Sequence, residues 1–258
     1  AGPTGSCGPC SEIHVDLGVQ YGGDENSKIG DEGTDNRFIE IWNLVFTEWN
    51  RMEDGSLEPL PKKNIDTGAG IERIASVIQE KKTNFETDLF MPIIQGIEKV
   101  LDIKKEDFDE TVKIIADHIR ASVFLICDGV LPSNEGRGYI LRKIIRRAFG
   151  AGSAAKGKVF EKEDIFLHKL VSYVVETMKE GYPELEEKKA MILKVLTEEE
   201  DKFYKTINQG LQILSDIESD MSKSGTKLMS GEDAFKLYDT YGFPLDLTKE
   251  ILEEKGLS

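Results

Sequence analysis

Four residues between positions 66 and 73 have the types and the spacing to bind a small molecule that carries both a phosphate and a positive charge. Asp66 supplies a carboxylate for a cationic group. Gly68 and Gly70 let the backbone approach a ligand closely, because neither carries a Cβ. Apolar residues then recur at helical spacing, so we expect a helix over residues 70–80, whose free N–H groups favour an anion. Arg73 adds a permanent positive charge in the first turn of that helix.

The local pattern alone also fits an ordinary turn ahead of a helix. In that interpretation Asp66 closes an Asx turn and Arg73 lies on the helix surface. A dinucleotide-binding fingerprint is excluded, because Arg73 stands where a third glycine is required. The preceding residues also make a poor central strand, since Pro59 and Pro61 cannot donate to a ladder.

The composition is that of an ordinary globular protein. Of the 258 residues, 39% are hydrophobic and 31% are charged, which allows one large core or two smaller ones. No run approaches the roughly 18 apolar residues of a membrane span, and the first residues lack the basic and apolar blocks of a signal peptide. Three cysteines do not make a disulfide framework, so we expect a cytoplasmic protein in a reducing compartment.

The charge distribution is uneven. The net charge of −15 argues against a nucleic-acid partner, because polyanions bind cationic surfaces. Residues 136–160 reverse this balance, with no acidic residue and seven basic ones: Arg137, Arg142, Lys143, Arg146, Arg147, Lys156 and Lys158. A small cationic patch on an acidic body is typical of a polyanion bound at one place. The alternative is a solvated helix face whose charges pair with acidic neighbours.

The first part of the chain has the pattern of an α+β domain. Alternation predicts a strand at residues 11–17, and a Gly- and Asp-rich loop follows at 21–35. An apolar run predicts a second strand at 38–49 with both faces covered. A turn signal at 53–56 indicates that the next segment folds back antiparallel.

The remainder is expected to be helical. Apolar residues at helical spacing predict helices at 112–129, 138–149, 162–178 and 184–219, with shorter ones from Ser230 and after Pro244. A linker is expected around residues 102–109. We therefore divide the chain into an α+β domain at 1–102 and a helical domain at 103–258.

Six segments carry a resemblance to a known family. Residues 65–77 are similar to motif 3 of the class II aminoacyl-tRNA synthetases. Five further runs follow the order found in the alanyl-tRNA synthetase branch of that family: 5–13 (GSCGPCSEI), 37–46 (RFIEIWNLVF), 116–120 (ADHIR), 132–139 (PSNEGRGY) and 237–244 (LYDTYGFP). This order along essentially the whole chain makes the resemblance far more specific than the glycine pair alone.

The resemblance implies a class II antiparallel sheet and an ATP-dependent alanine–tRNA ligase. In that reaction alanine and ATP give alanyl-adenylate, and the alanyl group then passes to tRNA(Ala), with Mg²⁺ bridging the phosphates of ATP. Asp66 matches the residue that pairs with the alanine ammonium group. Arg73 matches the motif 3 arginine that holds the ATP γ-phosphate, a task that suits a permanently charged guanidinium.

The same resemblance assigns the neighbours of these two residues. Asn43 and Val45 correspond to the alanine and adenylate pocket, Gly68 leaves room beside the substrate, and Gly70 leaves room for ATP. Asn43 and Val45 lie two residues apart in a predicted strand, so both face one side. The alternative for Asn43 is a core amide paired with the backbone.

The tRNA acceptor stem is the implied partner of the second half. Asn134 and Asp239 match the residues that read its G·U wobble pair, and Arg137, Arg142 and Arg146 are expected to bind the tRNA. The alternatives are a helix cap for Asn134 and a turn residue for Asp239. We expect no DNA partner and no membrane partner.

Cys7 to Cys10 spell the Cys-Gly-Pro-Cys tetrapeptide of thioredoxin-like oxidoreductases. Redox chemistry requires that motif to open a helix, whose N-terminus lowers the pKa of the thiol. Here it runs into an expected strand, and no Cys or His stands at zinc-ligand spacing. A loop packed near the substrate is the favoured interpretation of this tetrapeptide. A thiol oxidoreductase is kept as an alternative function.

The resemblance also implies that parts of the family's active site lie outside this sequence. Motifs 1 and 2, with an arginine for the ATP α-phosphate and a tryptophan of the alanine pocket, are expected before Ala1. The editing region, with its zinc-binding residues, is expected beyond Ser258, so no metal ligand is expected here. We therefore expect a piece that is inactive alone, and the alternative function is a non-catalytic tRNA-binding module.

Overall fold

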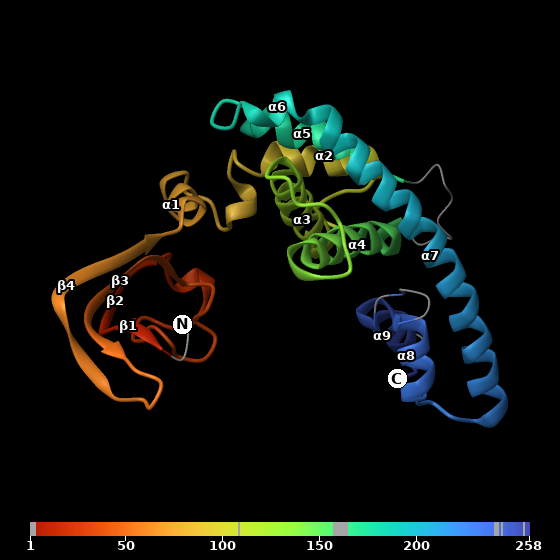
Figure 1. Ribbon diagram of the computed structural model, residues 1–258, viewed down its shortest axis with the longest axis horizontal. Helices are drawn as coiled ribbons and strands as arrows, with labels where there is room; N and C mark the ends of the chain where they lie inside the picture. The colour runs from red at the N-terminus through yellow and green to blue at the C-terminus, as the bar shows by residue number, and fades with distance from the viewer. Residues whose placement is uncertain (1–3, 108, 157–164, 240–242, 244, 255) are drawn as a thin grey trace. The chain divides into compact units, whose positions relative to one another are not determined.

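The structure, a computed structural model, describes residues 4–107, 109–156, 165–239, 243, 245–254 and 256–258 (Figure 1). The chain divides into two compact units, a sheet unit at Ala1–Leu89 and a helical unit at Phe90–Ser258. An antiparallel sheet followed by helices confirms the predicted α+β class. Within the described ranges every helix is too short or too polar to serve as a membrane span.

The sheet is built around β3 (Phe38–Arg51), to which its three partner strands all pair antiparallel. β1 (Gly5–Cys7) and β2 (Cys10–Asp16) share one edge of β3. β4 (Leu57–Ala69) pairs with the same β3 residues, so it must lie along the other edge. The strands expected at 11–17 and 38–49 are confirmed.

β3 and β4 form a hairpin whose turn lies where the sequence indicated. The Met52 N–H donates to Ser56 O at 2.9 Å, and Gly55 adopts a φ of +82°, which glycine reaches without a Cβ clash. Pro59 and Pro61 lie within β4, although the sequence argued only against a central strand there. Among the described strands β4 pairs with β3 alone, and an edge strand tolerates a missing N–H donor.

The Cys-Gly-Pro-Cys segment interrupts the strand that pairs with the first edge of β3. β1 ends at Cys7 and β2 begins at Cys10. The Phe46 N–H donates to Pro9 O at 2.8 Å, and a Cβ on Gly8 would lie 1.7 Å from Phe46 O. Only glycine permits this approach, so the tetrapeptide is a tight bulge in the sheet.

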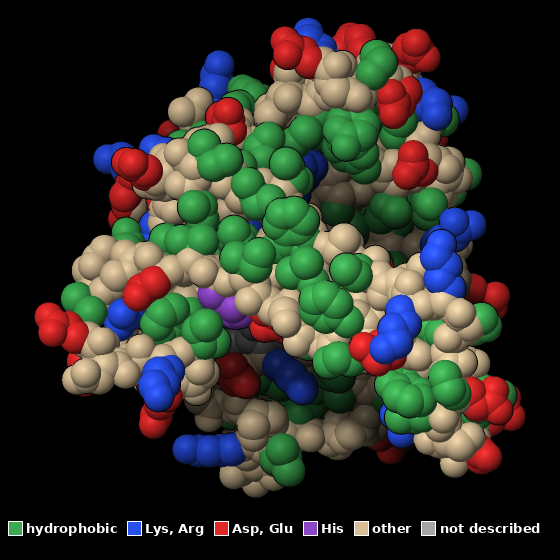
Figure 2. Space-filling view, turned by 90° about the vertical axis from the view of Figure 1, so that its left-hand side faces the viewer, with side chains coloured by type: hydrophobic (Ala, Val, Ile, Leu, Met, Phe, Trp, Pro, Cys, Tyr) green, Lys and Arg blue, Asp and Glu red, His purple; other side chains and the backbone are tan. Residues whose placement is uncertain are grey.

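One face of the molecule carries many hydrophobic side chains (Figure 2). The sequence predicted that both faces of β3 are covered, but Trp42 and Trp49 are 41% and 37% exposed. Ile13 and Ile65, from β2 and β4, are also exposed. The expectation of a fully covered strand is therefore wrong for this chain, because α1 (Ile71–Ile78) and the two 3₁₀ helices η1 (Val19–Tyr21) and η2 (Asn84–Glu86) are the only helical segments described in the sheet unit.

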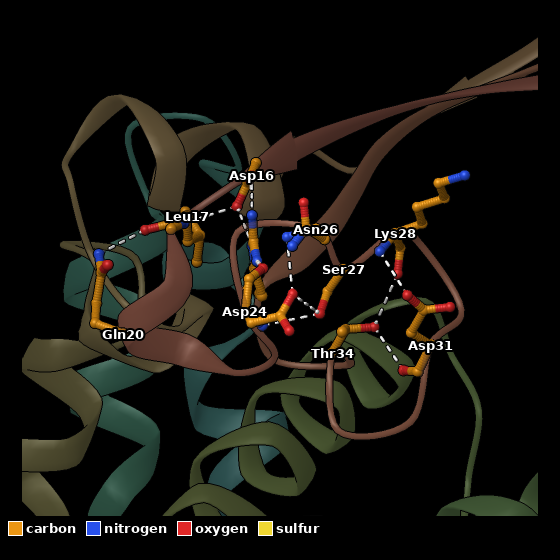
Figure 3. Close-up of polar contacts among 11 residues, drawn as sticks. Asp16, Leu17, Gln20, Asp24, Asn26, Ser27, Lys28, Asp31 and Thr34 are labelled. Atoms are coloured by element: carbon orange, nitrogen blue, oxygen red, sulfur yellow. Dashed lines mark hydrogen bonds and ion pairs between the residues drawn. The ribbon is translucent and has the colours of Figure 1, made fainter.

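One arginine holds the Gly- and Asp-rich loop between β2 and β3. The buried Arg37 donates through Nε and Nη2 to the two carboxylate oxygens of Asp16, at 2.7 Å each, and through Nη1 to Asp24 O. Beyond it, Asp24 accepts from the Asn26 N–H at 2.8 Å, and the Lys28 N–H donates to Asp31 at 2.7 Å (Figure 3). The loop thus consists of short turns that side-chain carboxylates close.

The helices of the second unit are, in order, α2 (Met91–Leu101), α3 (Asp109–Cys127), α4 (Gly136–Lys156), α5 (Leu167–Met178), α6 (Glu184–Glu187), α7 (Lys189–Ser224), α8 (Gly231–Asp239) and α9 (Leu245–Glu254). The apolar faces of α2 to α7 meet in one core, where Ile93, Ile119, Val171 and Leu196 are fully buried, whereas α8 packs against α7 and α9. This burial provides most of the stabilisation of such a bundle.

Two boundaries differ from those expected, and a third is not tested. α2 packs with α3 and α5, so the units meet at Leu89 and Phe90 and not at residue 102. The single helix expected at 184–219 is two, because Lys188 leaves the helical conformation at φ −96° and ψ 2°. The helix start expected near 162 lies outside the described residues, and α5 is described from Leu167.

The N-terminus of α5 is capped by a carboxylate from α7. Glu200 is fully buried and accepts the backbone N–H groups of Phe166, Leu167 and His168, at 3.1, 2.7 and 2.9 Å. It also lies 2.9 Å from His168 Nδ1. These donors are the ones that the first turn of a helix leaves unpaired, and α5 has no acidic residue of its own in that turn.

Removal of the Glu200 carboxylate is expected to destabilise the helical unit. Glu200→Ala leaves two buried donors and one part-buried donor unpaired and should lower the free energy of unfolding by roughly 2–4 kcal/mol. Urea unfolding followed by circular dichroism measures this. Glu198→Ala, an exposed position on the same helix, is the control and should change stability by less than about 0.5 kcal/mol. Equal effects of the two substitutions would contradict the capping role.

The Asp16–Arg37 pair is expected to make the loop sensitive to acid. The hydrogen bonds from Arg37 and from the Gly18 N–H lower the pKa of Asp16 from 3.8 to about 2. A carboxyl whose pKa is lowered by folding stabilises the fold at pH values above its unfolded-state pKa. This stabilisation is lost as the pH falls through the folded-state pKa. The stability advantage of the wild type over Asp16→Asn should therefore be constant above about pH 4 and shrink toward pH 2. Thermal unfolding across this range measures it, and a pH-independent difference would contradict the account.

Candidate functional site

The register of the β3–β4 hairpin brings four of the predicted site residues onto one face of the sheet. Asn43 lies directly opposite Gly68, and Val45 directly opposite Asp66. Opposed residues of an antiparallel pair project to the same side, and so do residues two apart in one strand. The alternate residues Leu44 and Thr67 project to the other side. The four residues therefore form one contiguous patch, which we call the hairpin patch.

β2 extends the hairpin patch with a carboxylate that the sequence did not single out. Glu12 lies opposite Asn43, and its Oε1 accepts the Asn43 side-chain amide at 3.1 Å. Glu12 Oε2 lies 3.1 Å from His14 Nε2. The partner of the Asn43 amide is therefore a side chain and not the backbone, which the alternative interpretation had expected. The available signal was the alternation of residues 11–17, which places Glu12 on one side of the strand, but sequence alone does not show which strand pairs with Asn43.

Within the hairpin patch, Asp66 and Gly68 are open to a ligand. Both are exposed, and among the described residues no side chain is paired with Asp66. A Cβ built on Gly68 would meet no atom within 4 Å. The fold of this chain therefore does not require glycine at 68, and the free carboxylate of Asp66 is available for a cationic group.

Arg73 follows the hairpin patch at the end of β4. β4 ends at Ala69 and α1 begins at Ile71 with Gly70 as its N-cap residue, which confirms the helix expected at 70–80. The Arg73 Nη1 donates to Glu40 O at 2.8 Å and lies 3.7 Å from Glu40 Oε2. A Cβ on Gly70 would lie 3.3 Å from Arg73 Cδ, so glycine leaves room for this side chain. Arg73 thus connects the first turn of α1 to β3 while half of its side chain stays exposed.

The predicted tRNA-binding residues of the helical unit fall into two groups. Arg137 is exposed in the first turn of α4, and so are Lys143 and Arg147 farther along it. Arg142 and Arg146 are instead directed at Glu199 of α7, at 3.1 and 3.2 Å. For these two arginines the structure therefore has the alternative arrangement, in which a basic side chain pairs with an acidic neighbour and not with a polyanion.

α4 and α8 are connected through two tyrosines. The Tyr139 and Tyr238 hydroxyl groups lie 3.2 Å apart, and both side chains are exposed. Asn134 precedes α4 and is exposed, whereas Asp239 is the last residue of α8 and its side chain lies outside what the structure describes. The tyrosine contact joins the two helices that carry or follow the predicted G·U-reading residues.

The three cysteines are free thiols. Cys7 and Cys10 lie at strand ends, opposite Trp49 and Val45 of β3, and neither opens a helix. The motif therefore lacks the helix that redox chemistry at this tetrapeptide requires. In the described part of the chain no group of three or more His, Cys, Asp or Glu side chains is arranged to hold a metal ion.

Comparison with known proteins identifies the family. The sequence profile of the family described as tRNA synthetases class II (A) matches residues 1–258. The chain belongs to this family. The resemblance read from residues 65–77 and the five further runs is thereby confirmed.

Three of the similar curated proteins are alanine–tRNA ligases by name. The chain is 59% identical to an alanine–tRNA ligase of Fusobacterium nucleatum, 53% to alanine–tRNA ligase 1 of Lachnoclostridium phytofermentans and 49% to an alanine–tRNA ligase of Shouchella clausii. These matches cover 100%, 98% and 98% of this class II synthetase chain but only 29%, 29% and 28% of the relatives. The chain thus spans less than a third of the length of the proteins that it matches.

Two glycine substitutions are expected to separate a structural glycine from one that faces a ligand. Gly8→Ala forces a Cβ onto the Phe46 backbone and should destabilise the sheet unit by about 2 kcal/mol or more. Gly68→Ala meets open space and should change stability by less than about 1 kcal/mol. Thermal unfolding of both variants checks this, and a large loss for Gly68→Ala would assign that glycine to the fold.

Proposed function

We propose that this chain supplies part of the alanine-activating site and the acceptor-stem-binding region of an alanine–tRNA ligase. The observation that carries the proposal is the β3–β4 register, which puts Asn43, Val45, Asp66 and Gly68 on one face. A class II synthetase activates its amino acid with ATP and transfers it to tRNA, and these steps need positioning and charge stabilisation more than covalent catalysis.

In this proposal the hairpin patch binds alanine. The Asp66 carboxylate pairs with the alanine ammonium group, since a small zwitterion needs an anion within about 3 Å of its amine. Asn43 and Val45, on the neighbouring strand, lie beside the bound alanine. The missing Cβ of Gly68 leaves room for the substrate. Glu12 holds the Asn43 amide in a fixed orientation.

ATP binds next to this patch. Arg73 moves its guanidinium from Glu40 to the γ-phosphate of ATP, and the N-terminus of α1 adds a favourable dipole. Gly70 gives the arginine side chain the space for that position. Mg²⁺, a hard cation that prefers oxygen ligands, would be held by the phosphates of ATP and would neutralise part of their charge.

The helical unit binds the acceptor stem of tRNA(Ala). Asn134 and Asp239 read the G·U pair, whose edges are accessible in the shallow minor groove of RNA. The exposed cations on α4, among them Arg137, contact phosphates. The three free thiols fit a reducing compartment such as the cytoplasm.

A second candidate is a tRNA-binding module without catalysis. The helical unit is a compact body with its own core, and the chain spans less than a third of its relatives. In this case the chain binds the acceptor stem while activation depends on residues elsewhere. The experiment below distinguishes the two.

Alanine-dependent ATP–pyrophosphate exchange tests the activation site. We expect negligible exchange from the 258-residue chain, and exchange once it is joined to the upstream segment that the resemblance implies. In that longer protein Arg73→Ala should lower the rate at least about 100-fold. Asp66→Asn should raise the KM for alanine at least about tenfold. Lys63→Gln, an exposed position in the middle of β4 whose side chain pairs with Glu48, is the control and should leave both parameters unchanged.

The outcomes separate the two candidates. Near-normal exchange in Arg73→Ala removes this arginine from the phosphate role. An unchanged KM for alanine in Asp66→Asn removes the hairpin patch from the substrate site and leaves the binding module as the better account. Robust exchange by the 258-residue chain would contradict the expectation that it is inactive alone.

A further inference from the structure

A buried carboxylate organises one side of α4. Glu199 of α7 is only 2% exposed, and its Oε1 lies 3.1 Å from Arg142 Nε and 3.2 Å from both Nε and Nη2 of Arg146. The Arg146 guanidinium also lies 4.8 Å from the centre of the Phe203 ring. Burial lowers the pKa of Arg146 and Glu199 opposes that shift, so the carboxylate offsets the cost of covering the two cations.

Arg142 extends from this ion pair to the loop before α4. Its Nη1 donates to the Asn134 side-chain oxygen, and its Nη2 lies 3.4 Å from Pro132 O. Its side chain is 21% exposed. Its buried Nε faces the Glu199 carboxylate without a hydrogen bond, and Nη1 and Nη2 donate to two acceptors of the chain, so little of the guanidinium is left for a phosphate.

The contact with Arg142 fixes which way the Asn134 amide points. A guanidinium has donors and no acceptor, so only the amide oxygen of Asn134 can face it. The amino group of the same side chain must then point away from Arg142, and Asn134 is exposed. An amide that would otherwise present either end is therefore held with its N–H donors outward.

We propose that Glu199 and Arg142 are positioning residues for Asn134, and that Asn134 meets the acceptor stem as a hydrogen-bond donor. This inference rests on the proposed function, because it assumes that Asn134 reads the wobble pair. It assigns Arg142 a role different from that expected from the sequence: Arg142 contributes to the choice between base pairs and not to the binding of phosphates. Arg137 and Lys143, which are exposed on the same helix, are left for the phosphates.

Salt dependence separates the two roles of an arginine. A side chain that neutralises a phosphate contributes a slope of about one to the dependence of log K on log salt, for all sequences alike. A side chain that only orients a base-reading group changes the preference between base pairs and leaves that slope unchanged. The two possibilities for Arg142 therefore predict different measurements.

The test uses RNA hairpins that carry the tRNA(Ala) acceptor stem with either G·U or G·C at the wobble position. Fluorescence anisotropy gives the Kd of each hairpin with the 258-residue chain over a range of NaCl concentrations. We expect Asn134→Ala and Arg142→Gln each to reduce the G·U preference by about fivefold or more, with no further loss in the double variant. The salt slope of Arg142→Gln should stay at the wild-type value. Arg137→Gln, the matched control, should lower the slope by about one and keep the preference.

Further variants protect the test against misfolding. Arg142→Lys keeps the charge beside Glu199 but cannot reach both contacts, so it should lose the preference while it remains folded by circular dichroism. Glu199→Gln should also lose part of the preference, and full retention would remove Glu199 from the arrangement. If Arg142→Gln and Arg142→Lys keep the preference, or Arg142→Gln lowers the slope by about one, the positioning role is overturned. If Asn134→Ala keeps the preference, the reading role in the proposed function fails instead.

Discussion

The pairing register between β3 and β4 is the constraint on which the site depends. A strand has a side-chain period of two, so a slip of one residue would send Asp66 and Gly68 to the face that now carries Thr67 and Ala69. A bulge between Thr47 and Trp49 separates the pairing next to the turn from the pairing at the site, so the register there is fixed by the ladder of residues 42–47 with residues 64–69. The strand then passes directly into α1 through Gly70, which gives Arg73 a defined position after the hairpin patch. The alignment of these two strands thus determines the positions of the Asp66 carboxylate, of Gly68 and of the Arg73 guanidinium.

The helical unit depends on a different kind of interaction, the satisfaction of buried charge. Two adjacent carboxylates of α7 act on different neighbours: Glu200 accepts the free N–H groups at the start of α5, and Glu199 faces two arginines of α4. Both are almost completely buried, and a buried charge without partners would be costly. α7 therefore fixes α4 and α5 by polar contacts in addition to apolar packing. Through Arg142 the same contacts reach Asn134, so the surface proposed to meet RNA is continuous with the interior of the unit.

Much of this arrangement could be predicted from the sequence, because local patterns determined it. The alternation in β2, the turn at 53–56 and the helix after Gly70 all appear where periodicity and turn chemistry indicated. The partners across space could not be predicted in the same way. Neither Glu12 beside Asn43 nor Glu199 beside Arg142 has a signal in its own segment, since each pairing depends on how distant elements pack. α2 was missed for a related reason: its short apolar run also fits the end of the α+β domain. The family itself was recognisable because six segments in a fixed order are far more specific than any single contact.

The central claim is that one face of the β3–β4 hairpin binds alanyl-adenylate. The most direct measurement is the protection of single cysteines from alkylation, in a longer protein in which Cys7, Cys10 and Cys127 are replaced. Cysteines are introduced one at a time at positions 42–45 and 66–69, and the rates are compared with and without a non-hydrolysable alanyl-adenylate analogue. The account predicts protection that alternates along both strands, at positions 43, 45, 66 and 68 and not at their neighbours. Protection at 42, 44, 67 and 69, or none that alternates, would contradict it.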